Sequence, residues 1–289
     1  MQAVLTRLPI WVRDRLPDDL VSQADEIRLR IGQPVELRTS SGSHLLGQPL
    51  LRDEMDETVR MLADHSIYAC EDRIRSGYFA LPGGFRVGLT GSYSMQNGVV
   101  SALPRIGSIS IRMAREIKGA ADKLMPHLMQ NGRALSTIIL SAPMMGKTTM
   151  LRDIARQMSE LGLHVAISDE RSELAGSKDG VPQMDVGPRT DVCDGLPKRQ
   201  AIPALVRAMA PEVIVTDELG HIEDAEAVQE AARSGVALIA SAHAGSYEEA
   251  KGRKALASLM EDGLFRRVVV LGGSPGRIQR ILNGAGEVI

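Results

Sequence analysis

The chain has few aromatic residues and few cysteines, and both shortages limit what it can do. Its 289 residues include one Trp, four Tyr and three Phe, so it offers few flat side chains on which the bases of a single-stranded nucleic acid could stack. Its two cysteines, Cys70 and Cys193, lie far apart and form no CxxC pair. This spacing gives no disulfide framework and is typical of reduced thiols in a cytosolic protein.

A strong net charge and a long apolar run are missing as well. The formal net charge of -2 provides no global basic field, so nucleic-acid binding would need a local basic patch. No stretch approaches the roughly 18 consecutive apolar residues of a membrane span. The start, MQAVLTRLPIWVRDRLPDD, has arginines and prolines where a signal peptide has its apolar core. We therefore expect a cytoplasmic protein that reaches a membrane only through a partner.

The chain does contain two distinct patterns, and the first covers residues 1–120. Short extended segments such as EIRLRIGQPVEL alternate with turns, and Gly83 and Gly84 predict a hairpin turn between two of these segments. One helix is expected over 53–69, with Met55, Val59, Leu62 and Ile67 on one face. We interpret residues 1–120 as a smaller α+β domain.

In the second pattern, over residues 121–289, five short apolar runs are separated by segments of helix length. The runs are STIIL, HVAIS, EVIVT, VALIAS and RVVVL, which begin at residues 136, 164, 212, 236 and 267. This alternation predicts an α/β fold with a mainly parallel sheet covered by helices. Residues 122–136 predict a helix with a turn at AsnGly. The stretch 171–197 is rich in Gly, Pro, Asp and Ser and too long for an ordinary connection, which favours a functional or mobile loop.

The run STIIL leads into SAPMMGKTTM, which holds most of the phosphate-binding pattern GxxxxGK[ST]. A strand, a close turn at Gly146 and a helix N-terminus direct backbone NH groups at a phosphate. Lys147 supplies charge for the β- and γ-phosphates, and the Thr148 hydroxyl supplies a ligand for Mg2+. Ser141 stands at the first glycine position, where freedom of φ is often useful. The predicted nucleotide loop consists of Ser141, Ala142, Pro143, Met144, Met145, Gly146, Lys147, Thr148 and Thr149.

Acidic residues and a histidine follow three other apolar runs. EVIVT is followed at once by Asp217 and Glu218, HVAIS by the acidic segment 169–173, and VALIAS by His243. Because the carboxyl ends of parallel strands meet at one edge of an open α/β sheet, these side chains are expected to converge on the phosphate loop. We predict that Asp217 holds the hydration shell of Mg2+ and that Glu218 orients or deprotonates the attacking water. The other catalytic candidates are Lys147, His243, Asp169 and Glu173.

In this order, the motifs resemble those of the secretion ATPase superfamily, the RecA-like P-loop motors of type II and type IV secretion and pilus machines. The similarity lies in the phosphate loop, the acidic box ISDERSE, the segment LVRAMAPEVIVTDE and the histidine box SAHAGS. Within the superfamily, the chain is similar to the stage III sporulation protein AA family of endospore-forming bacteria. The matching segments include EIRLRIGQPVEL, GGFRVGLTGSY, SDERSELAG and DVGPRTDVCDGLPK. In that family the position of Ser141 is not reliably glycine.

This resemblance implies an ATPase that uses ATP and Mg2+ to energise, or to gate by nucleotide binding, a channel complex between mother cell and forespore. It implies a RecA-like domain at 121–289 and a homo-oligomeric ring, with a hexamer favoured. It also implies a cytoplasmic place on the mother-cell side, docked to integral-membrane proteins of the complex. Arg112 resembles the linker arginine that neutralises γ-phosphate charge in ring ATPases. Arg86 and Arg105 are weaker choices, and Arg207 is a candidate sensor.

Two other functions stay open at this point. A RecA-like fold also suits a motor stimulated by nucleic acid, although the shortage of aromatic residues argues against nucleic acid as a partner. Stimulation of ATP hydrolysis by single strands and a salt-dependent affinity would identify such a motor. The other function is a nucleotide-gated scaffold with little hydrolysis, which single-turnover measurements would distinguish from a motor.

Overall fold

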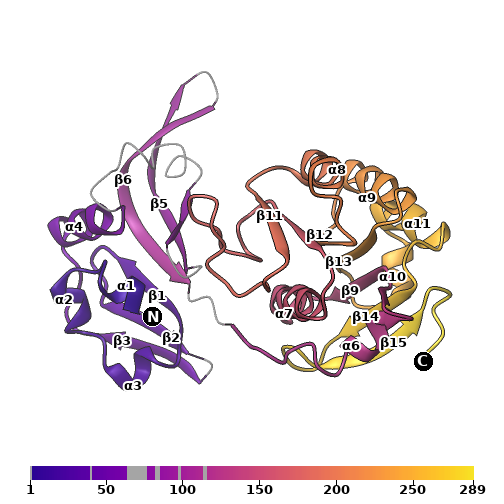
Figure 1. Cartoon of the computed structure of the whole chain (residues 1–289). Helices are drawn as coiled ribbons and strands as arrows, with labels where there is room; N and C mark the ends of the chain where they lie inside the picture. The colour runs from indigo at the N-terminus through magenta and orange to yellow at the C-terminus, as the bar shows by residue number, and fades with distance from the viewer. Residues whose placement is uncertain (1, 40, 64–76, 82–84, 97–98, 113–115) are drawn as a thin grey trace. The chain divides into compact units, whose positions relative to one another are not determined.

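The computed structural model describes residues 2–39, 41–63, 77–81, 85–96, 99–112 and 116–289. The chain divides into two compact units, an N-terminal unit of residues 1–115 and a C-terminal unit of residues 116–289 (Figure 1). The division therefore falls between residues 115 and 116, whereas the sequence pattern places it between 120 and 121. No helix in the described ranges is long and apolar enough to cross a lipid bilayer.

The N-terminal unit is built on a six-stranded antiparallel sheet with the strand order β3-β2-β1-β6-β5-β4. Alternation along β1 places Ile27 and Leu29 in the core, while Arg28 and Arg30 are half-exposed. Its elements are α1 (Gln2–Leu5), α2 (Ile10–Arg13), α3 (Asp18–Val21), β1 (Ala24–Arg30), β2 (Val35–Thr39), β3 (Gly42–Leu46), α4 (Arg52–Leu62), β4 (Tyr78–Leu81), β5 (Phe85–Gln96) and β6 (Val99–Arg112).

Two predictions for this unit extend beyond its described residues. The helix expected over 53–69 is α4, which buries Met55, Val59 and Leu62 as predicted, whereas Ile67 lies outside the described residues. The expected hairpin is present in its strands, because β4 and β5 pair antiparallel with Phe79 opposite Val87. The glycines predicted to form its turn lie at 83 and 84, outside the described ranges.

The C-terminal unit has a seven-stranded sheet with the order β11-β10-β12-β13-β9-β14-β15. All its strand pairs are parallel except β14 with β15. The elements are α6 (Met125–Leu128), β7 (Met129–Gln130), β8 (Arg133–Ala134), β9 (Thr137–Ser141), α7 (Lys147–Glu160), β10 (Val165–Asp169), β11 (Thr190–Asp194), α8 (Lys198–Met209), β12 (Val213–Glu218), α9 (Ile222–Arg233), β13 (Ala237–His243), α10 (Tyr247–Lys251), α11 (Lys254–Glu261), β14 (Arg267–Leu271) and β15 (Ile278–Asn283).

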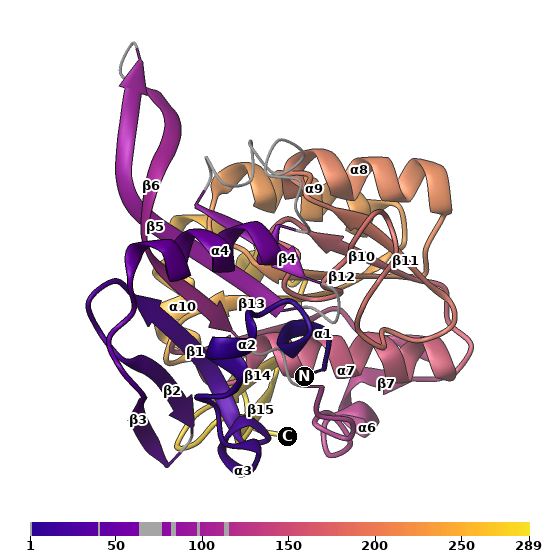
Figure 2. The same ribbon diagram turned by 90° about the vertical axis from the view of Figure 1, so that its left-hand side faces the viewer.

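Helices cover both faces of this sheet, with α7 on one side and α8 on the other (Figure 2). Ile139 of β9 packs into the core beneath α7, together with Met150 and Ile154. Its neighbours Ile138 and Leu140 point to the opposite face and pack in the core with α8, α9 and α11. A strand buried on both faces needs apolar residues at every position, which is why these strands read as continuous apolar runs. The expected α/β fold with a mainly parallel sheet is confirmed.

Two segments of this unit differ from the sequence interpretation. In the segment 122–136 the expected turn at AsnGly is confirmed, but the helix is only the single turn α6, and the β7–β8 hairpin follows it. Asn131 and Gly132 both have positive φ, 52° and 75°, which is the backbone that a tight hairpin turn requires. The stretch 171–197 contains the edge strand β11, and it buries Leu174 and Val186. This stretch is therefore packed against the sheet.

Candidate functional site

The predicted phosphate loop joins β9 to α7, as its pattern requires. Ser141 is the last residue of β9, and Lys147 is the first residue of α7. Between them, Met144 and Gly146 adopt positive φ, 63° and 86°. Ser141 has the extended backbone of a strand, so its position does not need a glycine. The left-handed conformation falls instead on Met144, whose side chain is 90% exposed.

A second turn, formed by residues 272–277 between β14 and β15, braces the phosphate loop. The backbone N of Gly276 donates a 2.9 Å hydrogen bond to the carbonyl of Met145. A Cβ atom on Gly146 would lie 3.0 Å from that same nitrogen. Gly146 is therefore needed both for its positive φ and for the close approach of the second turn. The run GGSPG predicts a tight turn, but its residues do not indicate which loop that turn contacts.

Lys147 is buried at the N-terminus of α7. Its Nζ donates to the carbonyls of Ser141 and Ala142 and to the Ser141 hydroxyl, at 3.1 Å each. The same Nζ lies 2.9 Å from Nδ1 of His243. Burial lowers the pKa of Lys147, and the negative charge of Glu218 opposes that change. The ammonium thus sits among uncharged acceptors within electrostatic reach of one carboxylate.

His243 connects this lysine to Glu218. Its Nε2 lies 3.0 Å from a carboxylate oxygen of Glu218, so one imidazole contacts both predicted groups. Strand register explains the meeting, because His243 of β13 is opposite Ser141 of β9, and Glu218 of β12 is opposite Ser241 of β13. Three of the predicted residues, Lys147, His243 and Glu218, are therefore brought together beside the phosphate loop.

Asp217 is buried and pairs with a residue that the sequence analysis missed. Nζ of Lys198, at the start of α8, lies 2.6 Å from Oδ1 of Asp217 and donates a 2.9 Å hydrogen bond to Glu170. The contact with Asp217 pairs the charges but is too oblique for a regular hydrogen bond. Burial raises the pKa of Asp217 to about 6 against the opposing charge of Lys198, and Asp169 and Glu173 add to the rise.

The pKa of Lys198 depends in turn on the carboxylates of Asp217 and Glu170. Burial alone would lower its pKa, but the charges of Asp217 and Glu170 and the hydrogen bond to Glu170 raise it above the ordinary value. The residue stands within DVGPRTDVCDGLPK, one of the segments similar to the sporulation family, but a lysine at a helix start gives no signal of burial. Its role follows from the packing of α8 and could not be read from spacing.

The acidic segment after β10 forms a tight turn that Asp169 holds. The buried carboxylate accepts hydrogen bonds from the backbone N of Glu173 (2.8 Å), Leu174 (3.1 Å) and Ala175 (2.8 Å). Burial raises the pKa of Asp169 despite these hydrogen bonds. Asp169 therefore shapes the turn that carries Glu173, and Glu173 is near enough to Asp217 to raise its pKa. Catalytic roles for Asp169 and Glu173 stay predictions.

The candidate arginines belong to other elements. Arg112 ends β6 in the N-terminal unit, where its mostly exposed guanidinium lies 4.0 Å from the carboxylate of Glu26. Arg86 lies over the ring of Tyr78, 4.2 Å from its centroid. Arg207 is exposed in the last turn of α8. The part that each plays toward a phosphate stays a prediction.

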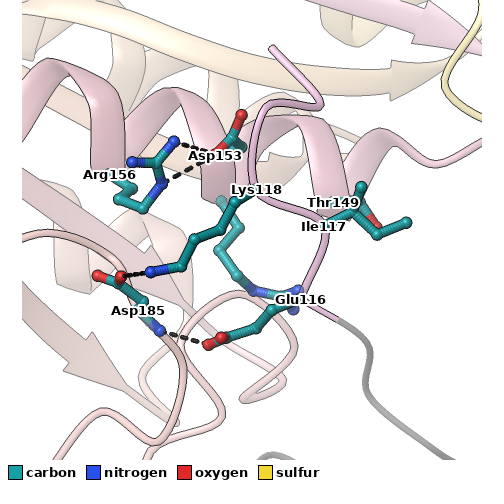
Figure 3. Close-up of a pocket in the computed structure, with 8 residues that line it drawn as sticks. Glu116, Ile117, Lys118, Thr149, Asp153, Arg156 and Asp185 are labelled. Atoms are coloured by element: carbon teal, nitrogen blue, oxygen red, sulfur yellow. Dashed lines mark hydrogen bonds and ion pairs between the residues drawn. The ribbon is translucent and has the colours of Figure 1, made fainter. Parts of the chain in front are cut away.

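A small hollow lies beside α7, where the chain enters the C-terminal unit (Figure 3). Lys118 pairs with Asp185, and Glu116 accepts a hydrogen bond from the backbone N of Asp185. Asp153 of α7 accepts a 2.8 Å hydrogen bond from the backbone N of Ala121. The lining residues are Glu116, Ile117, Lys118, Thr149, Arg152, Asp153, Arg156 and Asp185. These contacts attach residues 116–121 to the unit beside α7, the helix that follows the phosphate loop and is called the phosphate helix below.

The residues at this sheet edge fit a nucleoside triphosphate with Mg2+. Within the described ranges, no group of three or more His, Cys, Asp and Glu side chains is placed to hold a metal ion alone. Mg2+ at nucleotide sites usually takes one or two protein oxygens and completes its shell with phosphates and water. Thr148 and Asp217 offer such oxygens, and Oδ1 of Asp217 is a buried acceptor without a regular hydrogen bond. A cation would stabilise this carboxylate in its charged form.

Comparison with known proteins identifies the family. The model of the family described as sporulation stage III, protein AA matches residues 9–289. The chain belongs to this family. Stage III sporulation protein AA of Bacillus subtilis (strain 168) is 37% identical over 281 residues, which cover 95% of this chain and 91% of that protein.

Solved structures share the fold. The ATPase DotB of Legionella pneumophila matches 91% of this chain and 76% of its own, with a TM-score of 0.64 and 17% identity. The ATPase DotB of Yersinia pseudotuberculosis matches 95% of this chain and 79% of its own, with a TM-score of 0.66 and 14% identity. At such identities the likeness concerns the fold alone. The expected RecA-like architecture of the secretion ATPases is thereby confirmed.

Proposed function

We propose that this member of the sporulation stage III protein AA family is a Mg2+-dependent ATPase. The observation that carries the proposal is the contact series from Lys147 through His243 to Glu218 beside the phosphate loop, with separations of 2.9 and 3.0 Å. A lysine at the phosphate loop and a carboxylate that can position water, both at the carboxyl edge of a parallel sheet, are groups that phosphoryl transfer to water uses. The two DotB proteins of the same fold are named as ATPases, which supports the assignment.

Different residues of the chain bind the phosphates, position the attacking water and accept its proton. Backbone NH groups at the start of α7 and the ammonium of Lys147 bind the phosphates. Lys147 exchanges the uncharged carbonyls of Ser141 and Ala142 for phosphate oxygens, which are stronger partners for an ammonium. Glu218 orients the attacking water and accepts its proton, while His243 holds the Glu218 carboxylate in place. Thr148 and Asp217 would hold Mg2+, whose positive charge would offset negative charge on the phosphates.

The family suggests what the ATPase serves. We propose that it energises or gates a transmembrane channel complex of sporulation, from the cytoplasm on the mother-cell side, as a homo-oligomeric ring with a hexamer favoured. Integral-membrane proteins of that complex would be its partners, and Arg112 would neutralise γ-phosphate charge. Family membership and the fold shared with secretion ATPases support this wider role.

Phosphate release and nucleotide binding by the purified chain test the proposal. Lys147→Ala removes the phosphate-binding ammonium and should abolish binding of a fluorescent ATP analogue. Glu218→Gln should keep binding within about threefold and lower kcat by about 100-fold or more, because it removes the proton acceptor. Glu230→Gln, on the far end of α9 from Glu218, is a matched control that should change neither quantity.

Three outcomes would overturn parts of the proposal. Normal turnover by Glu218→Gln would show that another group accepts the proton. ATP binding by the wild type without phosphate release, also in single-turnover conditions, would favour the nucleotide-gated scaffold. Stimulation by single-stranded nucleic acid that weakens with salt would favour the nucleic-acid motor.

A further inference from the structure

Arg152 of α7 is a buried arginine with no place in the mechanism described so far. Its side chain lies about one and a half helical turns beyond Lys147, inside the unit. Its Nε donates a 2.6 Å hydrogen bond to the carbonyl of Leu174, and one Nη donates a 2.8 Å hydrogen bond to the carbonyl of Glu173. Because a buried guanidinium is costly unless its donors are matched, both hydrogen bonds are needed to keep it inside.

The same turn is held from its other side by Asp169. That carboxylate accepts hydrogen bonds from the NH groups of residues 173, 174 and 175. Arg152 donates hydrogen bonds to the carbonyls of residues 173 and 174. Opposite ends of the same peptide units are therefore fixed by two buried, oppositely charged side chains. Asp169 comes from β10 and Arg152 from α7, so the turn is bonded to the sheet and to the phosphate helix at once.

Asp169 and Arg152 together form a clamp on the turn, and this clamp fixes the backbone position of Glu173. The turn follows Asp169 at the end of β10, where Ser168 is paired with Thr216, the residue before Asp217 in β12. The negative charge of Glu173 also contributes to the raised pKa of Asp217, the predicted Mg2+ residue. A backbone shift of about 1 Å at the turn would move the Glu173 carboxylate relative to Asp217, and misplacements of this size are enough to slow catalysis by about 100-fold. The two hydrogen bonds of Arg152 to residues 173 and 174 end at the backbone of the turn, so they give it a direct hold on the position of Glu173.

We propose that Arg152 is a positioning residue of the phosphate site, which holds the turn 173–175 on the phosphate helix and so keeps Glu173 beside Asp217. The inference rests on the ATPase activity proposed above. It predicts that loss of Arg152 affects the chemical step rather than nucleotide binding, because Lys147 and the loop remain intact.

Kinetics of the full-length chain test this. Arg152→Gln should lower kcat by about 10- to 100-fold, the usual range for a lost supporting hydrogen bond at a catalytic site, and leave the Kd of a fluorescent ATP analogue within about threefold. Arg152→Lys, which keeps the charge and one donor group, should recover part of that loss. Arg156→Gln is the matched control, since Arg156 lies one turn further on α7 and pairs with Asp153 and Glu160.

A double-mutant cycle separates positioning from general stability. Glu173→Gln should lower kcat about as far as Arg152→Gln does. The kcat of the double variant should be no lower than that of the more impaired single variant. Fully additive losses would overturn the proposal, because they would mean that Arg152 acts independently of Glu173. A tenfold loss of binding by Arg152→Gln with unchanged kcat would overturn it too.

Amide hydrogen exchange gives a readout that does not depend on hydrolysis. Arg152→Gln should speed exchange at the amides of residues 173–175 by about tenfold or more, whereas Arg156→Gln should leave them protected. Unchanged protection in Arg152→Gln would overturn the clamp. If the wild type released no phosphate, the proposed function would fail, and the exchange measurement would still decide whether Arg152 holds the turn. If Arg152→Gln failed to fold, Arg152→Lys would carry both measurements.

Discussion

Replacing Lys198 by Met removes the ammonium that lies 2.6 Å from the buried carboxylate of Asp217, while the apolar stem of the side chain is nearly retained. The other partner of Lys198, the Glu170 carboxylate, is partly exposed and can be hydrated instead. The change therefore acts mainly on Asp217. We expect Lys198→Met to lower the free energy of unfolding by an amount that depends strongly on pH.

The magnitude follows from the pKa of Asp217, which burial raises from 3.8 to about 6. The folded chain holds this proton more tightly than the unfolded chain does, so the stability from this group is complete below the unfolded value of 3.8. It is lost as the pH rises through about 6. At about 1.4 kcal/mol for each pH unit between the two pKa values, the wild type loses about 3 kcal/mol through this group.

Without the ammonium, the pKa of Asp217 rises further, so the loss continues to grow above pH 6. Its upper limit at pH 7.5 is the free energy needed to keep the carboxyl protonated, about 5 kcal/mol. Lys198→Met should therefore be less stable than the wild type by up to about 2 kcal/mol at pH 7.5. At pH 5 the carboxyl is mostly protonated in both chains, and the difference should vanish.

Urea unfolding of the full-length chain at pH 5 and pH 7.5, in metal-free buffer, measures this difference. Helix circular dichroism mainly follows the C-terminal unit, which contains the long helices α7, α8 and α9. Comparison of that one transition avoids treating the two units as a single cooperative system. Lys123→Met, at an exposed lysine, serves as the control. A loss of stability that is equal at both pH values would refute the reasoning.

Two further predictions concern the phosphate loop. Gly146 has a φ of 86°, and Gly146→Ala would place a Cβ atom 3.0 Å from the backbone N of Gly276. This change should lower the free energy of unfolding by about 1–3 kcal/mol and weaken binding of a fluorescent ATP analogue at least tenfold. Gly162→Ala, with φ of 101° but open space around the Cβ position, should lower stability and leave binding unchanged, and equal binding by both variants would contradict the close-approach argument. At Met144, where φ is 63°, Gly should be more stable than the β-branched Val by about 1 kcal/mol in thermal unfolding; equal melting temperatures would contradict the strain assigned to this residue.

The sequence allowed the centre of the C-terminal sheet to be predicted but not its edges. β9, β10, β12, β13 and β14 are buried on both faces, so each produced an apolar run of strand length. β11 pairs with β10 only along one side and is half-exposed, with the polar sequence TDVCD. Such a strand is defined by the backbone that it pairs with, and a pattern of side chains does not reveal it.

The same distinction holds for the site. The meeting of Lys147, His243 and Glu218 could be predicted because parallel strands bring their carboxyl ends to one edge. The contacts of Lys198 and Arg152 could not, since Lys198 depends on how α8 packs against the end of β12 and Arg152 on how α7 packs against the turn at 173–175. A charged residue on a helix is usually solvated, so its burial becomes evident only when the tertiary structure is known.

The fastening of residues 116–121 to α7 has a mechanical consequence. Asp153 accepts a hydrogen bond from the backbone N of Ala121. Just before it in the chain, Glu116 accepts a hydrogen bond from the backbone N of Asp185, and Lys118 forms an ion pair with the Asp185 side chain. A rotation of α7 would therefore either carry residue 121 with it or break the hydrogen bond between Ala121 and Asp153.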